Sequence, residues 1–395
     1  MVSINNKWIR GALPAVLIHI SIGSVYAWSL FVKPISDYIG QSQAKVQFAF
    51  SLAIFFLGMS AAFGGKIVEK NIHKSSLISC LCFCSGLILT SFAIRYKQLP
   101  LIYLGYGCLM GVGLGTGYIT PVKTLMLWFK ENKGLATGIS VCAFGFASSV
   151  ASPIITYLTN KTTLPNTFIV LSCIYFVPMM IAHFIIKKPD GWVEVANKDD
   201  TFKVSSMWKQ KEFVFIWIII FINITCGLAL ISTASPIMVE HNINTKTIAI
   251  IVSIMGIFNG CGRLVFSAFS DKLKQRITIY KIILMLSIST SIITRLYTNT
   301  ITIAISLAVI SACYGAGFSC LPTLLSDIYD MKHISQIHGL SLTAWAIAGL
   351  VGNQISSITK SVTDSYNNVY FIICGMYSFA LIFTFLIKTK ELKKV

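Results

Sequence analysis

The sequence has 395 residues, of which 55% are hydrophobic and 12% charged, and its mean hydropathy is +0.75. A soluble protein carries about a quarter charged residues, so this composition excludes a water-soluble enzyme or a string of soluble domains. About a dozen apolar segments, from 11–33 to 368–388, are each long enough to cross ~30 Å of hydrocarbon. We therefore expect an all-α membrane protein with twelve transmembrane helices in two pseudo-symmetric six-helix bundles.

The formal net charge of +18 reflects the excess of basic residues in the loops between these segments. If both termini are cytoplasmic, the basic residues on that side outnumber those outside by more than two to one, as the positive-inside rule requires. Membrane topology therefore explains the positive charge, and nucleic-acid binding is not needed to explain it. We expect the protein in a bacterial inner membrane or in a eukaryotic plasma or organelle membrane. The eleven cysteines do not converge on a metal site, and we expect no cofactor.

The first segments in chain order contribute two candidate residues and one gate residue. His19 lies well inside span 11–33 and is the candidate proton site, although a lone histidine in a helix is more often structural. Tyr26, in the same span, is a candidate substrate contact. Glu69 follows span 46–66 at its cytoplasmic end and is a candidate gate residue.

The fourth span, 100–127, contains Tyr118, Pro121 and Lys123. Tyr118 is a candidate substrate contact, and Pro121 can bend the helix for gating. Lys123 has two interpretations: its long side chain snorkels to the nearby interface, or it supplies a second positive group for a dianion. Glycines spaced four residues apart in this span predict close helix packing.

A polar segment, 187–212, divides the chain into predicted bundles 1–186 and 213–395 and is expected to be a cytoplasmic linker. The halves repeat three features at nearly the same separation along the chain: Glu69 and Asp271, Pro121 and Pro322, and Gly134 and Gly339. Such duplication predicts a transporter in which two bundles rock around a central site, with Asp271 and Pro322 as further gate residues. No phosphate-binding GxxxxGK[ST] motif is present, so gradients are the expected source of energy.

Span 247–269 contains the most informative residue, Arg263, which lies eight positions before Asp271 and so ~12 Å inside the polar end. Steps of three or four residues place it on a polar stripe with Asn259 and Ser267. One interpretation is snorkelling to the headgroups, and the other is an arginine in a central pathway that binds an anion. No acidic residue lies well inside a span, so a substrate carboxylate is the expected partner.

Two later spans add aromatic candidates, Tyr314 in 301–327 and Trp345 in 338–359. Together with Tyr26 and Tyr118 they are expected to form a water-poor box around Arg263 that selects a small anion. Each ring taken alone is also explained by packing or by anchoring at the interface. The scarcity of acidic residues inside the spans favours exchange or uniport over proton symport.

Several motifs in this order resemble the oxalate/formate antiporter family of the major facilitator superfamily, which is related to monocarboxylate porters. They are Gly23-Ser-Val-Tyr26-Ala-Trp28, Gly111-Val-Gly-Leu-Gly-Thr-Gly-Tyr118-Ile-Thr-Pro121, Gly134-Leu-Ala-Thr-Gly138, Asn259-Gly-Cys-Gly-Arg263 and Tyr314-Gly-Ala-Gly317. The resemblance implies twelve helices, alternating access and a carboxylate substrate, and it supports Arg263 as the ligand. It also implies a lysine where Trp345 stands, and in monocarboxylate porters an acid where Asn259 stands.

These differences favour a monoanion such as lactate, pyruvate or formate as the substrate. We expect the protein to be a secondary transporter and not an enzyme. An oxalate/formate-type exchanger of dicarboxylates, with Lys123 as second cation, is the alternative. A ligand sensor on a carrier scaffold, without net transport, is the alternative of another class. We expect the protein to act as a monomer, with the lipid bilayer and a small carboxylate as its partners.

Overall fold

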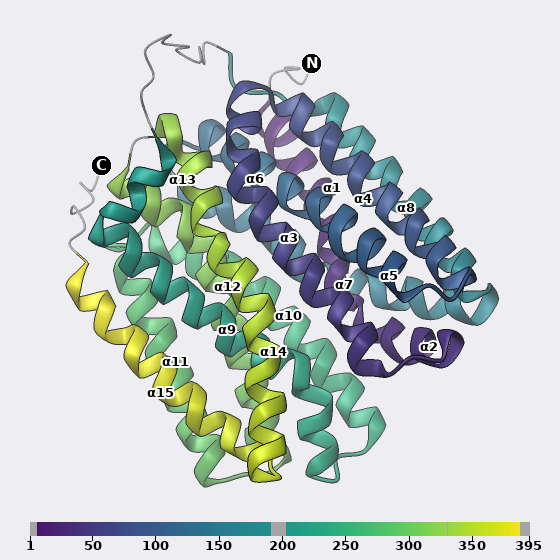
Figure 1. Cartoon of the computed structure of the whole chain (residues 1–395). Coiled ribbons are helices and arrows are strands. Elements are labelled where there is room, and N and C mark those ends of the chain that lie inside the picture. Colours follow the sequence, from purple (N-terminus) through teal and green to yellow (C-terminus); the bar gives the residue numbers. More distant parts are fainter. Residues whose placement is uncertain (1–5, 191–202, 330, 388–395) are drawn as a thin grey trace.

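The computed structural model describes residues 6–190, 203–329 and 331–387, and Figure 1 shows them as a bundle of long helices. In these ranges twelve helices are long and apolar enough to cross a membrane. The twelve predicted spans are thereby confirmed, and no strand occurs in the described residues. Part of the predicted linker, 191–202, lies outside them.

The first half contains η1 (Trp8–Ala12), α1 (Leu13–Ile22), η2 (Gly23–Ala27), α2 (Ser29–Ile39), α3 (Gln43–Lys70), α4 (Ile72–Arg95), α5 (Leu99–Ile102), η3 (Tyr103–Leu109), α6 (Met110–Trp128), α7 (Lys133–Lys161) and α8 (Leu164–Ile185). The first span is not one uniform helix, because η2 narrows to a 3-10 turn and α2 follows in a new segment. Gly23 causes no clash there because it has no side chain: a Cβ at this position would lie 2.4 Å from the Phe144 carbonyl oxygen of α7.

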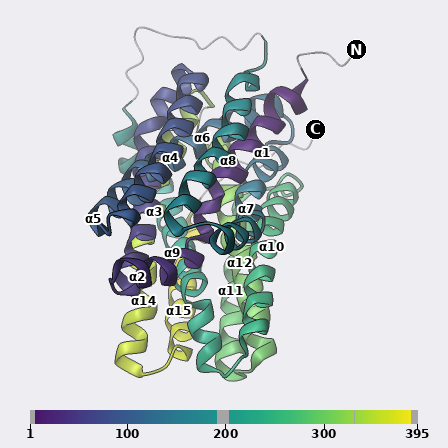
Figure 2. The same ribbon diagram turned by 90° about the vertical axis from the view of Figure 1, so that its right-hand side faces the viewer.

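The second half contains η4 (Val204–Lys209), α9 (Lys211–Glu240), α10 (Thr245–Ser270), α11 (Ile277–Leu296), α12 (Thr300–Ile328), η5 (Met331–His333), α13 (Ile334–Ser341), α14 (Thr343–Thr363) and α15 (Asn367–Leu386). The predicted span 338–359 is a longer helical segment that α13 and α14 share. Figure 2 shows the helices running roughly along one axis, with α14 and α15 reaching the end opposite to η1.

The end of the molecule that holds Arg10, Lys188 and η4 is called the linker end below. There the backbone nitrogen of Lys187 donates to the Arg10 carbonyl, and Lys188 donates to the Glu69 carbonyl at the end of α3. Figure 1 shows the two halves side by side, in contact near this end and leaning apart toward the opposite one. The contact surface is made chiefly by α7 against α10 and by α3 against α13 and α14.

Glycines bring these helix pairs together. A Cβ on Gly58 of α3 would lie 2.4 Å from the Leu342 carbonyl oxygen, and a Cβ on Gly134 of α7 would lie 2.3 Å from that of Ser267. Backbones at this separation exclude any larger residue, which is how small residues promote helix association in membranes. The close contacts position α10, and therefore Arg263, directly against the first bundle.

Candidate substrate site and gate

Arg263 of α10 is completely buried, with 0% of its surface exposed. Its Nε donates to the Asn259 side-chain oxygen at 2.8 Å, one helical turn earlier and away from the linker end. The side chain therefore does not snorkel. Both terminal nitrogens are buried without a hydrogen-bond partner among the described residues. A buried cation costs at least ~2.5–3.5 kcal/mol on insertion scales, and two such donor groups are chemically suited to a bound anion.

Aromatic rings surround the guanidinium. Its carbon lies 5.5 Å from the ring centre of Phe144 and 5.1 Å from that of Phe318, distances at which a ring face stabilises a cation. Arg263 also interacts electrostatically with the phenol groups of Tyr26 and Tyr118, whose hydroxyls lie close to the guanidinium without forming a hydrogen bond of good geometry with its terminal nitrogens. The rings exclude water, so hydrogen bonds from the free terminal nitrogens are stronger than they would be in solvent.

The rings come from both halves and contact one another across the interface. The hydroxyls of Tyr26 and Tyr314 are hydrogen-bonded at 2.9 Å, which joins η2 to α12. Trp345 of α14 lies 5.4 Å from Tyr118 and 4.2 Å from Phe318, measured between ring centres. The structure therefore brings together the four aromatic residues that the sequence predicted and places them around Arg263.

Two further polar atoms in this cluster are buried without a hydrogen-bond partner among the described residues: the Tyr118 hydroxyl and the Trp345 indole nitrogen. Both are donors, as are the terminal nitrogens of Arg263. Buried donors are normally satisfied, and leaving one unsatisfied costs about 1–3 kcal/mol. A group of unsatisfied donors around a cation is suited to an acceptor-rich anion.

Phe144 and Phe318 belong to the cluster but were not predicted. Phe318 lies four residues after Tyr314, so helical periodicity places it on the same face of α12 and could have identified it. Phe144 offered no such signal, because its role depends on the contact between α7 and α10. Small residues allow this contact: a Cβ on Gly145 would lie 3.1 Å from Cδ of Arg263, and one on Gly315 would lie 3.0 Å from its Cγ.

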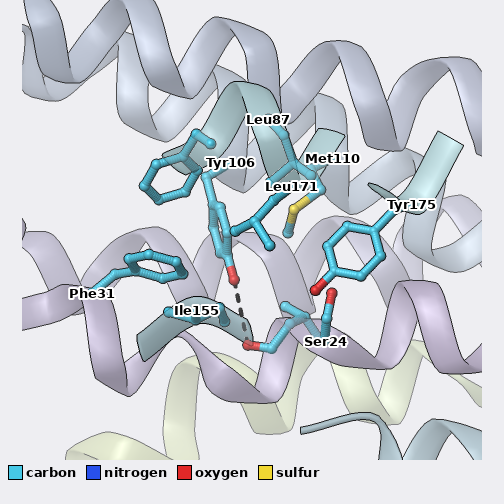
Figure 3. A pocket seen from close by; sticks show the side chains of 10 residues that line it. Ser24, Phe31, Leu87, Tyr106, Met110, Ile155, Leu171 and Tyr175 are labelled. Atoms are coloured by element: carbon cyan, nitrogen blue, oxygen red, sulfur yellow. Dashed lines mark hydrogen bonds between the residues drawn. The ribbon is translucent and has the colours of Figure 1, made fainter. Parts of the chain in front are cut away.

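A separate small cavity lies inside the first bundle, between η2, α2, α4, η3, α6, α7 and α8 (Figure 3). Its lining is mostly apolar, with Tyr106 donating to the Val25 carbonyl at 3.3 Å and the Tyr175 hydroxyl beside Ser24. None of the predicted site residues lines it. It is distinct from the Arg263 cluster.

Comparison with known proteins identifies the family. The model of the Major Facilitator Superfamily matches residues 15–353. This chain belongs to the Major Facilitator Superfamily.

The oxalate:formate antiporter of Oxalobacter formigenes is 24% identical over 95% of this chain and 90% of its own length. Human monocarboxylate transporter 12 is 21% identical over 90% of this chain and 74% of its own. The fold is similar to that of the proton:xylose symporter XylE, with a TM-score of 0.78, 13% identity and 98% coverage of both chains.

In this major facilitator protein the two repeated acids lie at equivalent contacts at the linker end. Glu69, near the end of α3, accepts from the backbone and side-chain nitrogens of Gln336 at 3.3 and 2.5 Å. Asp271, at the end of α10, accepts from the backbone nitrogens of Gly134 and Leu135 at 3.0 and 2.9 Å. Each acid thus caps the first turn of a helix in the other half, where the helix dipole favours negative charge.

Basic side chains support both acids. Arg276 is ion-paired with Asp271 at 2.6 Å and with Asp327 at 2.5 Å, and these two carboxylates raise the pKa of Arg276 despite its burial. Lys123 is buried, and its ammonium lies 3.9 Å from a Glu69 oxygen. The structure therefore places Lys123 in the linker-end contact, about five residues along α6 from Tyr118, and not in the aromatic cluster.

The two prolines named as gate residues lie inside membrane helices. Pro121 is buried in α6, three residues after Tyr118, and Pro322 is buried in α12, four residues after Phe318. Each removes a backbone donor between the aromatic cluster and the linker end, where a helix bends most easily.

His19 is fully buried in α1, beside the cluster. Its Nε2 lies 3.1 Å from the Tyr118 carbonyl oxygen, and its Nδ1 contacts both the carbonyl oxygen and the hydroxyl of Ser140, the hydroxyl at 3.1 Å. The imidazole and the Tyr118 ring are 5.3 Å apart, and His19 interacts electrostatically with Arg263. The predicted proton site therefore lies beside the aromatic cluster.

Proposed function

We propose that this protein is a secondary transporter of small monocarboxylates such as lactate, pyruvate or formate, with Arg263 as the residue that binds the carboxylate. One observation carries the proposal: a fully buried guanidinium has both terminal nitrogens free of hydrogen bonds to the described residues. A guanidinium stays charged when desolvated, and its two terminal nitrogens match the two oxygens of a carboxylate.

Asn259 sets the direction of this interaction. Because its oxygen accepts from Nε at 2.8 Å, the guanidinium is held beside the rings of Phe144 and Phe318, and its two terminal nitrogens are left for another partner. A carboxylate bound to that edge would make two parallel hydrogen bonds, and the hydroxyl of Tyr118 and the indole nitrogen of Trp345 are free to donate to the same anion. This arrangement supports Asn259, Tyr118 and Trp345 as site residues, with Tyr26 and Tyr314 covering the site through their mutual hydrogen bond.

The charge of the site favours a monoanion. Arg263 is the cation inside the described aromatic cluster, whereas Lys123 lies beside Glu69. A dicarboxylate such as oxalate would place a second negative charge among aromatic rings without a paired cation, which burial makes costly. The similarity to an oxalate:formate antiporter and to a monocarboxylate transporter supports a small carboxylate as the substrate class.

Transport requires the site to open alternately to each side of the membrane. The contacts made by Glu69 and Asp271 support these acids as the gate of the linker end, which they hold closed in this conformation. Pro121 and Pro322 are the proposed bending points. We assign 1–186 and 213–395 as the rocking bundles, joined by 187–212, with both termini and the linker end facing the cytoplasm.

The complete cluster comes from one chain, which supports a monomer as the working unit in a cell membrane. All the aromatic residues around Arg263 and the acids of both gate contacts belong to the same polypeptide. No second copy is needed to form the site.

The substitution Trp345→Lys tests the charge argument. A lysine here adds a second cation beside the cluster, so we expect uptake of oxalate to rise relative to that of lactate, on the order of tenfold per ~1.4 kcal/mol of added attraction. Uptake of both labelled anions into proteoliposomes gives the ratio, and Trp345→Phe is the control without charge. An unchanged ratio would exclude Trp345 from the site.

Counterflow in proteoliposomes tests the function itself. Liposomes loaded with an unlabelled monocarboxylate should transiently accumulate labelled lactate, pyruvate or formate, and much less oxalate. Saturable binding without counterflow would favour the ligand sensor, and preferential counterflow of oxalate would favour the dicarboxylate exchanger.

A further inference from the structure

A fully buried amide lies beside the aromatic cluster in the second half of the molecule. Asn223 of α9 has 0% of its surface exposed, and neither its side-chain nitrogen nor its side-chain oxygen has a hydrogen-bond partner among the described residues. An asparagine that only joins membrane helices forms hydrogen bonds to a neighbouring helix. Buried polar groups are normally paired because an unpaired one is costly, so this amide is suited to bind a polar group that enters the protein.

Asn223 packs against the part of α12 that carries two rings of the cluster. A Cβ added at Gly317 of α12 would clash with the Asn223 amide nitrogen, and Gly317 directly precedes Phe318. One turn further along α9, a Cβ added at Gly227 would clash with the Tyr314 ring. Asn223 and Gly227 are four residues apart and so share one face of α9. This face therefore contacts α12 from Tyr314 to Gly317.

Arg263 approaches the same helix from the other side of these rings. A Cβ on Gly315 would lie 3.0 Å from Cγ of Arg263, so Gly315 faces α10, whereas Gly317 faces α9. At ~100° per residue the two glycines point ~200° apart, and Tyr314 and Phe318 project between them on the shorter arc. The two rings are 5.1 Å apart between their centres, and the Phe318 ring centre lies 5.1 Å from the guanidinium carbon. The guanidinium and the α9 amide therefore flank one face of α12, which the two rings cover.

The two groups differ in charge, and this difference sets what each can bind. The guanidinium pairs with a carboxylate, whereas a neutral amide offers two donor hydrogens and one acceptor oxygen. A hydroxyl or keto oxygen on the tail of a bound anion can bond to such an amide without bringing a second charge into the site. A second carboxylate would remain without a cation, so the two groups together fit a monoanion with a neutral polar substituent.

We propose that Asn223 is a specificity residue that hydrogen-bonds a hydroxyl or keto group on the tail of the transported monocarboxylate. The inference rests on the proposed function of Arg263 and deepens it, because it names the part of the substrate beyond the carboxylate. The carboxylate binds Arg263, the carbon chain crosses the rings of Tyr314 and Phe318, and the neutral oxygen reaches the amide. Without such a bond, an added hydroxyl would only lose its hydration among the rings and weaken binding.

Hydroxylated and plain forms of one acid test this assignment in proteoliposomes. The reporter is uptake of labelled lactate, pyruvate or formate, whichever shows the strongest counterflow. The competitors are butyrate and its derivatives with a hydroxyl on the second, third or fourth carbon. We expect at least one hydroxybutyrate to inhibit the wild type about two- to tenfold more strongly than butyrate, the effect of one neutral hydrogen bond. In Asn223→Leu, which replaces the amide with an apolar group of similar size, butyrate should inhibit at least as strongly as every hydroxybutyrate.

Thr225→Val is the matched control. The Thr225 hydroxyl is also buried without a hydrogen-bond partner in the described part of the chain, but it lies two residues after Asn223 and so on another face of α9. This variant should keep the wild-type preference. A wild type that prefers butyrate to every hydroxybutyrate, or an Asn223→Leu variant with an unchanged preference, would overturn the inference.

Gly317→Ala provides a second readout in which the amide is kept but displaced. The added methyl group would take the space of the Asn223 amide nitrogen, which is the end of a flexible side chain, so the amide moves while α12 stays intact. We expect the hydroxyl preference to fall toward that of Asn223→Leu. Gly375→Ala, whose Cβ meets nothing within 4 Å, should leave it unchanged.

An unchanged preference in Gly317→Ala would overturn the inference even if Asn223→Leu failed to fold. Absence of counterflow for all three labelled anions in the wild type would instead overturn the proposed function.

Discussion

Arg263→Ala is expected to abolish carboxylate uptake into proteoliposomes while leaving the protein folded. Loss of one partner of a buried, hydrogen-bonded charge pair costs about 2–5 kcal/mol, roughly a thirtyfold to several-thousandfold loss of affinity. Stability should not fall in parallel, because the guanidinium of the free protein is a buried charge whose terminal nitrogens have no partner among the described residues. Lactate should raise the melting temperature of the wild type in detergent, and that of Arg263→Ala should not respond.

Arg295→Ala is the matched control, since Arg295 lies at the exposed end of α11. Its uptake and its response to lactate should equal those of the wild type. Arg263→Lys keeps the charge but loses the paired nitrogens and the Nε contact with Asn259. We therefore expect its carboxylate uptake to be intermediate or severely reduced. Uptake by Arg263→Ala at the wild-type rate would exclude Arg263 from the transport site.

Gly58→Leu is expected to block transport through a different step, the closure of the linker end. A Cβ at this position would lie 2.4 Å from the Leu342 carbonyl oxygen and 2.7 Å from the Ala346 backbone nitrogen, so α3 and α14 must separate. Overpacking of this kind costs about 1–3 kcal/mol, enough to shift a two-state equilibrium roughly five- to 150-fold. We expect uptake to fall by a similar factor.

Hydrogen exchange of individual backbone amides shows where Gly58→Leu changes the structure. The backbone nitrogens of Gln336, Gly134 and Leu135 are held by Glu69 and Asp271 across the linker end, so their exchange should accelerate in Gly58→Leu. Gly375→Leu in α15 is the control, because a Cβ there meets nothing within 4 Å. Normal protection of these amides in Gly58→Leu, together with normal uptake, would contradict the assignment of the closed contact.

The number and order of the membrane helices followed from hydropathy, because each helix must hide its own backbone polar groups in hydrocarbon. The positions at which the helices begin and end were less predictable. The span 338–359 is part of a longer helical segment in the structure, since backbone hydrogen bonds continue the helix beyond the apolar residues. The narrow turn Gly23–Ala27 depends on contact with α7, which no local pattern indicates.

The candidate site was predictable where it depends on one helix. Arg263 and Asn259 are four residues apart, so their shared face, and hence their hydrogen bond, follows from helical geometry. Contacts between helices were not predictable in this way. Lys123 and Glu69 are ion-paired although they lie in different spans, and only the tertiary structure shows that Lys123 contacts this acid and lies outside the aromatic cluster.

The same limit applies to His19. Its position inside the first span identified it as a candidate, but the two carbonyls and the hydroxyl that surround it come from α6 and α7. Its environment therefore depends on how the helices pack.

The most direct test of the account is a structure determined with a bromine-substituted monocarboxylate, whose heavy atom identifies the bound anion. We expect both carboxylate oxygens within about 2.7–2.9 Å of the two terminal nitrogens of Arg263, with the bromine among the aromatic rings. An anion bound elsewhere, with those nitrogens still unpaired, would contradict the central claim.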